Sequence, residues 1–537
     1  MEYFSIKRSF FIVPSKKCYE NFNKIDKFIN LLEKSGVGKI LKNVKFNNKN
    51  CKGRKGYNQY NLFAAIVYCF AFFNATLRDI EDKCINDLRI IYIMEGIVPN
   101  YSTIGDFINT YIVPYQYEIF TCINKEIIKE LHLDMSDNYI DGTKIEANAN
   151  KYKFVWKPTK FHNRLDIKIK ELLDKIGYKY SKEFIKSYEF DNVLKEYAIK
   201  NNIDTNNIPS GTRNKLTEEQ KNYKVGYMYL IKLLEYEEKE RICGDNRNSY
   251  FKTDHDATAM VLKEDYYSKL SHDFHAGYNI QLMVSSLLIV MYGVFQDRAD
   301  ITTLIPMNEL YYKYYGKYPT NECDDAGYGN YENYKYIKKH GINNYIKFQN
   351  WEGESSGKNP QLFYVFDDGV MCLNSNIGEE VEFDYYHQKR NKDGVLYKFT
   401  GCNNCNYSYK CKAKLKEENK NTNYRYYELI PEYELLKEEV RKNLLSPKGI
   451  EIRINRSIQD EGTFGQMKNN MNYDRIRRRG MKKVSAEVML MSLGINIRRY
   501  INSLENNKFK NNCWKTPTDL KPEKFPTVKP KIKKSVK

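Results

Sequence analysis

Apolar residues recur at helical spacing in the N-terminal quarter of the chain. Between residues 57 and 133 they return every three or four positions, as in Leu62, Ile66 and Phe70. This periodicity is typical of amphipathic helices. The segment Thr103 to Asp106 resembles the capped start of a further helix. The pattern therefore predicts a small helical domain over residues 57–133.

The period changes at Asn138, where NYIDGTKIEANA alternates as a strand does, with a bend at Gly142. Residues 160 to 250 then form a long, highly charged helical stretch. Two runs, GYNIQLMVSS and LLIVMYGVFQ, follow and predict a hairpin of strands. This apolar region is too short and too interrupted by polar residues for a membrane span.

Helices and strands alternate after the hairpin. TTLIPMNELYYKYY predicts a helix, a strand ends at NECDDAGYG, NYENYKYIKKHG predicts another helix, and NNYIKFQN another strand. Residues 450 to 505 are helical again. Strands in this order predict an α/β fold, with a mixed sheet that includes an antiparallel portion and is flanked by helices.

The same patterns divide the chain into eight parts. We expect a basic N-terminal segment (1–56), the helical domain (57–133), a first part of the core (134–159), a charged helical insertion (160–252), a central core (253–352), a cysteine-containing insertion (353–445), a helical C-terminal part of the core (446–506) and a basic tail (507–537), Lys- and Pro-rich and disordered after Pro517.

The net charge of the chain is a clue to its binding partner. The chain has 537 residues, and 87 Lys and Arg against 68 Asp and Glu give a net charge of +19. Such a balance suits a polyanion such as nucleic acid, and the helical domain would then bind DNA rather than only pack. A bias towards A/T-rich codons, which favour Asn, Lys, Ile and Tyr, explains the charge equally well. The start MEYFSIKRSF has no signal-peptide pattern, so we expect a cytoplasmic protein without a membrane partner.

Three carboxylates lie where catalytic groups of such a sheet are expected. Asp141 is on the first core strand, and the pair Asp324 and Asp325 ends a later strand, where α/β sheets bind ligands. Glu461 lies on the C-terminal helix. Three such carboxylates are the donors that a pair of Mg²⁺ ions needs for phosphoryl transfer. Among 68 acidic residues, many other triples could be drawn from residue chemistry alone.

The helix around Glu461 carries further features. Glu461, Phe464, Gly465 and Lys468 share one side at helical spacing. Ser457 to Asp460 resembles a helix-start box, so Asp460 is interpreted as a helix cap.

Four blocks of the chain are similar to the signature blocks of DDE transposases from bacterial insertion sequences. They are IDGTKIEANANKYKFVWK, FQDRADITTLIPM, DDAGYGNYENYKYI and NRSIQDEGTFGQMK. The nearest group has a catalytic core split by a long insertion after the first Asp. The stretch with LRDIEDKCINDLR and PNYSTIGDF is similar to the N-terminal domain of these enzymes. The resemblance extends over most of residues 55–500.

The resemblance implies a ribonuclease-H-like core and a set of roles. Asp141, Asp325 and Glu461 would be the catalytic carboxylates that hold Mg²⁺ or Mn²⁺, and Lys468 would contact DNA. The partners implied are the terminal inverted repeats of the element and target double-stranded DNA, bound by a homodimer on paired ends, in a bacterial cytoplasm at the nucleoid. The family also has an Arg four residues before the Glu and a Tyr nearby. Here Arg456 is one residue out of register and the Tyr is missing.

Two further clusters point to binding. Residues 474–483, DRIRRRGMKK, are the densest basic run, and we expect phosphate contacts from Arg475, Arg477, Arg478, Arg479, Lys482 and Lys483. Four cysteines, Cys372, Cys402, Cys405 and Cys411, could hold a structural Zn²⁺, and related transposases are similar in carrying a cysteine cluster here. Free thiols in a reducing cell are the alternative.

Two other functions remain open from the sequence. One is a metal-dependent nuclease on the same core without strand transfer. The other is a DNA-binding protein that has lost catalysis, although its three carboxylates are intact.

Overall fold

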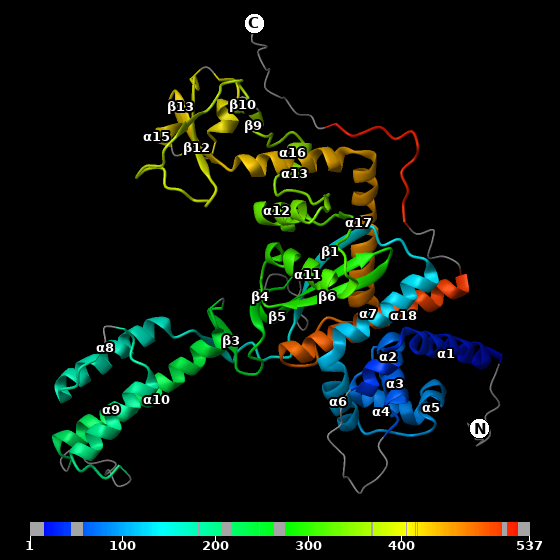
Figure 1. Cartoon of the computed structure of the whole chain (residues 1–537), viewed down its shortest axis with the longest axis horizontal. Helices are drawn as coiled ribbons and strands as arrows, with labels where there is room; N and C mark the ends of the chain where they lie inside the picture. Colours follow the sequence, from blue (N-terminus) through cyan, green and yellow to red (C-terminus); the bar gives the residue numbers. More distant parts are fainter. Residues whose placement is uncertain are drawn as a thin grey trace, which may run out of the picture. The chain divides into compact units, whose positions relative to one another are not determined.

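The computed structural model describes residues 16–43, 57–180, 183–205, 216–245, 247–262, 274–366, 369–403, 405–413, 415, 417–506 and 513–524 (Figure 1). The chain divides into two compact units. The first unit comprises residues 1–143, 279–474 and 482–537, and the second comprises residues 144–278 and 475–481.

The N-terminal part of the first unit is helical. Its helices are α1 (Lys16–Ser35), α2 (Val37–Asn43), α3 (Gln59–Phe73), α4 (Leu77–Asn86), α5 (Leu88–Met94), α6 (Tyr101–Phe107) and α7 (Gln116–Leu131), with a π-turn (Ile108–Ile112) and a short 3₁₀ turn (Val113–Tyr115) before α7. Within the segment 1–56, interpreted only as basic, α1 and α2 pack against α7. Asn100 caps α6, so the helix start expected at Thr103 is wrong by about one turn.

Helix α3 is buried along most of its length, and helix α18 (Met481–Asn506) approaches it at Gly494. Within the described residues, no single helix is long and apolar enough to cross a membrane, although α3 and α4, bent by 101°, meet those criteria as a pair. A Cβ atom at Gly494 would lie 2.8 Å from the Cα atom of Ala71. A glycine is therefore required at position 494, because the backbones of α18 and α3 approach too closely there for a side chain.

Gly494→Ala is expected to destabilise the protein by about 1–3 kcal/mol, because backbone atoms of α3 must move to admit the methyl group. Gly462→Ala is the matched control, since nothing lies within 4 Å of its Cβ position. This control should gain up to about 1 kcal/mol of helix propensity. Urea unfolding followed by circular dichroism measures both changes. Equal stability of the two variants would contradict the close contact.

A mixed sheet follows the helical part. It contains β1 (Asp137–Glu146), β4 (Thr258–Val261), β5 (Phe274–Ser285), β6 (Leu288–Phe295), β7 (Asn321–Glu322) and β8 (Asn343–Asn344), in the order β4-β5-β1-β7-β8, with β6 also paired to β5. The β5–β6 hairpin is antiparallel, whereas β7 is parallel to both β1 and β8. This confirms the predicted hairpin and mixed sheet. The sheet and its helices are compatible with a ribonuclease-H-like fold.

Helices cover this sheet. They are α11 (Leu304–Tyr315), which packs against β6 and α7, and α12 (Tyr331–Lys339), which packs against β8. Short 3₁₀ turns lie at Asp300–Thr302 and Ala326–Tyr328. A buried amide network joins α7, β6 and α18: Asn496 donates to Asn124 Oδ1 at 2.9 Å, and Ile289 N donates to Asn496 Oδ1 at 2.9 Å. These contacts fix the helices against the hairpin.

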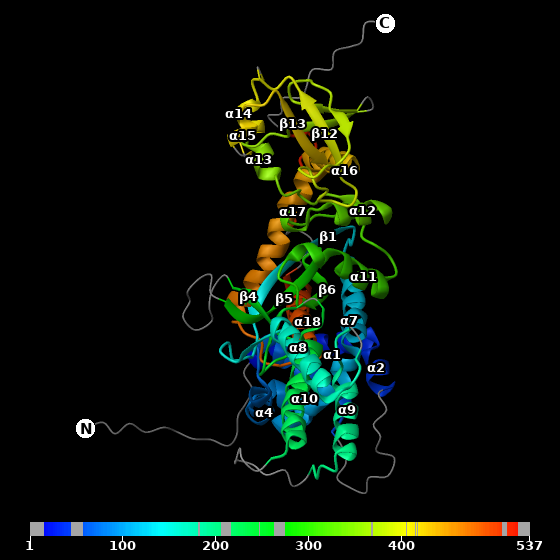
Figure 2. The same cartoon turned by 90° about the vertical axis from the view of Figure 1, so that its left-hand side faces the viewer.

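A small β-rich part carries the clustered cysteines. It comprises α13 (Trp351–Ser355), β9 (Phe363–Phe366), β10 (Gly369–Cys372), β11 (Glu379–Val381), β12 (Val395–Thr400), α14 (Ser408–Cys411), α15 (Glu417–Lys420) and β13 (Tyr424–Leu429). Strands β9 and β10 pair, as do β11, β12 and β13. Figure 2 shows β12 and β13 side by side, with α16 (Pro431–Leu445) starting where β13 ends.

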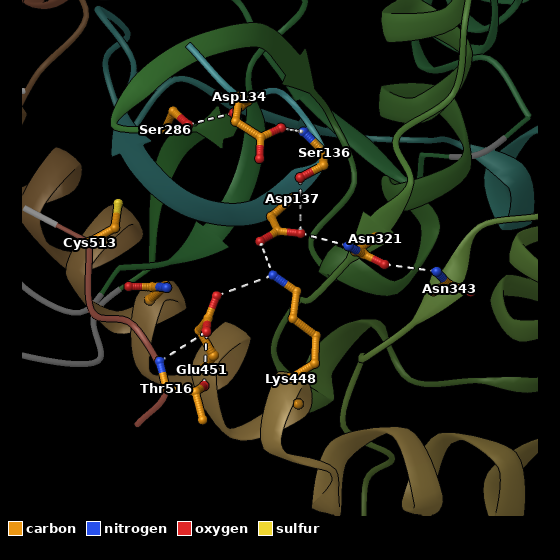
Figure 3. A network of polar contacts seen from close by, with 12 residues as sticks. Asp134, Ser136, Asp137, Ser286, Asn321, Asn343, Lys448, Glu451, Cys513 and Thr516 are labelled. Carbon is orange, nitrogen blue, oxygen red and sulfur yellow. Dashed lines mark hydrogen bonds and ion pairs between the residues drawn. The ribbon is translucent and has the colours of Figure 1, made fainter. Parts of the chain in front are cut away.

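Helix α17 (Pro447–Gly465) starts at a sharp corner after α16 (Figure 1) and continues into a π-turn, Gln466–Asn470. A polar network fixes its start against the sheet (Figure 3). Lys448 Nζ lies 2.9 Å from Asp137 Oδ2, and Asn321 Nδ2 donates to Asp137 Oδ1 at 2.6 Å. The first turn of α17 therefore lies at the beginnings of β1 and β7. Further along α17, Gln459 Oε1 accepts a hydrogen bond from Leu287 N in the β5–β6 turn at 2.9 Å.

The C-terminal segment 513–524 lies along α17. Thr516 N donates to Glu451 Oε2 at 3.0 Å, and Glu523 N donates to Leu445 O at 2.9 Å. The prediction that the chain after Pro517 takes no part in the fold is therefore wrong for residues 518–524. Residues 525–537 lie outside the described part.

The second unit contains a helical bundle made of α8 (Thr159–Ile176), α9 (Ser187–Lys200) and α10 (Glu218–Cys243), with an apolar core that includes Ile169, Phe190 and Leu233. Strands β2 (Phe154–Trp156) and β3 (Ser249–Phe251) pair beside it. The helices lie within the residues predicted as a charged helical insertion.

Candidate active site

Asp141 lies in the middle of β1, and Asp325 lies three residues after the end of β7, the strand parallel to β1. In the pairing of β1 with β7, Asp137 is opposite Asn321 and Asn138 is opposite Glu322. The same register, continued beyond β7, would set Asp325 opposite Asp141. Asp141 is half-buried, and its Oδ1 accepts a hydrogen bond from Gly142 N at 2.8 Å. Burial raises the pKa of Asp141, the Gly142 hydrogen bond and Arg456 lower it, and the charge of Asp325 raises it. The two carboxylates are thus electrostatic neighbours.

Asp324 has a different environment from Asp325. Asp324 is fully buried, and one carboxylate oxygen accepts a hydrogen bond from Ile140 N at 2.6 Å. Burial and the adjacent buried Glu322 hold the pKa of Asp324 well above its usual range. Asp325 is exposed, and the choice of Asp325 as the catalytic residue stays a prediction.

A glycine is required next to Asp141. A Cβ atom at Gly142 would lie 2.0 Å from Gln281 Nε2, because the buried Gln281 side chain crosses this point to donate to Asp300 Oδ1 at 2.8 Å. Asn279 Nδ2 donates to the same oxygen at 2.9 Å. The expected bend is absent, since β1 runs unbroken through Gly142. Asp300 therefore has a structural role, because its Oδ1 accepts hydrogen bonds from both amide side chains.

On α17, Asp460 is buried, whereas Glu461, the predicted catalytic residue, is exposed. Asp460 lies in the fourth turn of α17 and is fully buried, so its interpretation as a helix cap is wrong; Ser446 caps this helix instead. Neither oxygen of Asp460 has a hydrogen-bond partner. Burial and then the charge of Asp141 hold the pKa of Asp460 well above its usual range. Glu461, the next residue, is exposed.

Arg456 lies among these carboxylates. Its Nη1 is 3.8 Å from Asp460 Oδ2, one helical turn away. The charges of Asp460, Asp325 and Asp141 raise the pKa of Arg456, while burial lowers it. The arginine predicted to contact DNA therefore also neutralises part of the acidic cluster.

Lys468 lies in the π-turn that ends α17 and is half-buried. The π-turn changes the helical repeat, so the regular spacing from Glu461 to Lys468 does not extend through it. Its role in DNA contact stays a prediction.

The chemistry of the donors fits a hard divalent cation, because Asp141, Asp325 and Asp460, whose oxygens accept no hydrogen bond, all supply carboxylate oxygens. Across the ranges that the structure describes, no group of three or more His, Cys, Asp or Glu side chains is placed so that it could hold a metal ion. The described carboxylates are therefore not arranged as a complete set of metal ligands.

The basic run 475–479 belongs to the second unit and is partly engaged there. Arg475 Nε lies 3.5 Å from Glu146 Oε1, and Arg479 Nε donates to Asn148 O at 2.7 Å. Arg475, Arg477 and Arg478 are half-buried, whereas Arg479 is exposed. In the first unit, Lys482 and Lys483 are exposed at the start of α18.

The four cysteines predicted as zinc ligands come together. Cys372, Cys402, Cys405 and Cys411 line one small cavity next to Arg425, whose Nη1 donates to Cys411 Sγ at 2.8 Å. Burial raises the pKa of Cys372, and the charges of Cys405 and Cys411 raise it further. The thiols thus line the same cavity and all four are free, although no three of these described thiols are placed so that they could hold a metal ion.

The sequence pattern misses the burial of Asp460. Its signal is present, however, because Arg456 stands four residues before it, and that spacing puts the two charges on one helix face. The buried position could not be inferred without knowing which face of α17 meets the sheet.

A comparison with protein families bears on these residues. Residues 374–501 match the family model of a transposase DDE domain. This range contains α16, α17 and most of α18, with both Asp460 and Glu461. No curated protein and no solved structure gave a match. Residues 374–501 are therefore similar to a transposase DDE domain, and this match supports the resemblance seen in the block NRSIQDEGTFGQMK, which lies within that range.

Proposed function

We propose that this chain is a DNA transposase that binds the terminal inverted repeats of an insertion sequence, cuts at the element ends and joins them to target DNA. One observation carries the proposal. Asp141 on β1 and Asp325 after the parallel strand β7 are electrostatic neighbours of each other and of Asp460 on α17, in a chain whose residues 374–501 match a transposase DDE domain.

In this proposal the core is ribonuclease-H-like. Asp141, Asp325 and Glu461 would hold Mg²⁺ or Mn²⁺. When bound, two such ions activate a water or 3′-hydroxyl nucleophile and stabilise the leaving oxygen. Gly142 N–H orients the Asp141 carboxylate, and Arg456 limits repulsion among the acids.

DNA would be held by basic side chains outside the carboxylate cluster. Exposed Arg479, Lys482 and Lys483 would contact phosphates, with Arg475, Arg477, Arg478 and Lys468 as further proposed contacts. The proposed assembly is a homodimer on paired ends, in the cytoplasm of a bacterial cell at the nucleoid.

The four clustered cysteines would bind one structural Zn²⁺ as thiolates. We expect purified protein to contain about one zinc per chain by atomic absorption, and Cys402→Ser with Cys405→Ser to lose it. Cys243→Ser is the control, because Cys243 is buried in the second unit among apolar residues. Protein that takes up no zinc when refolded with an excess of it would contradict this site.

The direct test of the proposed function is cleavage of a DNA fragment that carries the sequences flanking the coding region of the chain. We expect strand scission at the element ends with Mg²⁺ and none with EDTA, and loss of scission in Asp325→Asn. Binding without scission under every condition would favour the alternative of an inactive DNA-binding protein.

A further inference from the structure

The backbone of the basic run, residues 475–479, is hydrogen-bonded within the second unit. Ile476 N donates to Glu146 O at 2.8 Å, and the Ile476 side chain is buried. Two residues further along each segment, Asn148 Nδ2 donates to Arg477 O at 2.8 Å. The end of β1 and the residues that follow it therefore fix the first part of the run.

A second loop of the same unit fixes the residues that follow the run. Gly480 N donates to Asp254 Oδ1 at 3.1 Å, and Met481 N donates to Asp256 Oδ2 at 2.7 Å. Asp254 is buried and also accepts a hydrogen bond from Tyr278 OH at 2.8 Å. Helix N-termini often bind phosphate, but here carboxylates already accept the backbone N–H groups at the start of α18. A phosphate would therefore meet the side chains of the run instead.

Asn148 holds the last arginine of the run. Arg479 Nε donates to Asn148 O at 2.7 Å, and Arg479 Nη2 donates to Asn148 Oδ1 at 3.4 Å. The amide nitrogen of the same side chain is the donor to Arg477 O. Arg479 is exposed, and among the described residues its Nη1 has no hydrogen-bond partner. Asn148 thus fixes one edge of the guanidinium and leaves Nη1 available to an acceptor.

This arrangement suits an arginine that binds phosphate. Arginine recognises phosphate through N–H groups in a planar fork, so the orientation of the guanidinium matters. A side chain that is ordered before binding also loses less conformational freedom when the ligand arrives. Both contacts of Arg479 are with oxygens of a neutral asparagine, so they leave its positive charge uncompensated.

We propose that Asn148 is a positioning residue for DNA, which holds Arg479 so that the guanidinium meets a phosphate of the DNA backbone. The inference rests on the proposed function, since it requires that the chain binds DNA. It adds to the DNA-binding surface a neutral residue that lies far from the basic run in the sequence.

The test measures affinity of the full-length protein for two duplexes of equal length, one carrying an element end and one unrelated, by fluorescence anisotropy at several salt concentrations. We expect Arg479→Ala to weaken binding to both duplexes about tenfold. The slope of log affinity against log salt concentration should fall by about 0.9, as for one lost phosphate contact. Asn148→Ala should weaken binding about fivefold. The double variant should bind no more weakly than Arg479→Ala, because Asn148 acts through this arginine.

Asn150→Ala is the matched control, because Asn150 lies on the same segment and its side chain accepts a hydrogen bond from Tyr152 N instead. We expect it to change the affinity less than twofold. Arg479→Lys keeps the positive charge but lacks the planar fork, so it should weaken binding by about the same factor as Asn148→Ala. This variant tests the positioning with Asn148 intact, and it decides the question if the melting temperature of Asn148→Ala shows that this variant does not fold.

Native affinity in Arg479→Lys or in folded Asn148→Ala, or additive losses in the double variant, overturns the inference and leaves the proposed function intact. A native chain that binds neither duplex overturns both. These outcomes separate a misassigned positioning residue from a misassigned protein.

Discussion

Asp141→Asn is expected to lower DNA cleavage by at least about 1,000-fold, or ~4 kcal/mol of transition-state stabilisation. The substitution keeps the shape of the side chain and an oxygen that can accept the hydrogen bond from Gly142 N. It removes the negative charge that would bind the cation. Because burial disfavours the ionised carboxylate of Asp141 and raises its pKa, the amide should not reduce the free energy of unfolding.

The control is Asp134→Asn, the same substitution at an exposed position before β1. Its cleavage rate should stay within about twofold of the native rate, because the side chain is exposed and Asn keeps an oxygen that can accept the hydrogen bond from Ser136 N. Single-turnover cleavage in Mg²⁺ measures both variants. A rate for Asp141→Asn that equals the control rate would remove Asp141 from the site.

The largest expected loss of stability follows Arg441→Ala. Arg441 on α16 and Glu354 on α13 form a buried ion pair, in which Nη2 and Oε2 are 2.7 Å apart and both side chains are less than a tenth exposed. Arg441 also contacts Glu438 and lies over the Phe348 ring. Truncation leaves a buried carboxylate uncompensated, so we expect a loss of about 3–5 kcal/mol.

Urea unfolding followed by tryptophan fluorescence tests this loss, since Trp351 is buried at the start of α13. Arg241→Ala removes an exposed Arg–Glu pair of similar geometry on α10 and should have no measurable effect. The double variant Glu354→Leu with Arg441→Met should recover most of the loss, because apolar side chains need no partner. A single variant as stable as the Arg241→Ala control would contradict the account.

The hairpin β5–β6 could be predicted because its apolar runs are long and punctuated, and α12 could be predicted from its periodicity. Asp141 and Asp325 could be selected because they match the motif blocks of the similar family and lie on or after predicted strands, even though β7 has only two residues; their roles stay predictions. The burial of Asp460 could not be predicted, because it depends on which face of α17 packs against the sheet. The packing of residues 513–524 could not be predicted either, because it depends on contacts with Glu451 and Leu445 rather than on the composition of the segment.

The central claim is that this chain joins DNA as well as cutting it. The most direct measurement incubates the native chain and Mg²⁺ with a fragment carrying the element ends and with a target plasmid, and then sequences the junctions. The account predicts products in which the 3′ ends of the element are joined to target DNA, and none in the Asp141→Asn reaction. Cleaved ends without any junctions would contradict transposition and identify a nuclease on the same core.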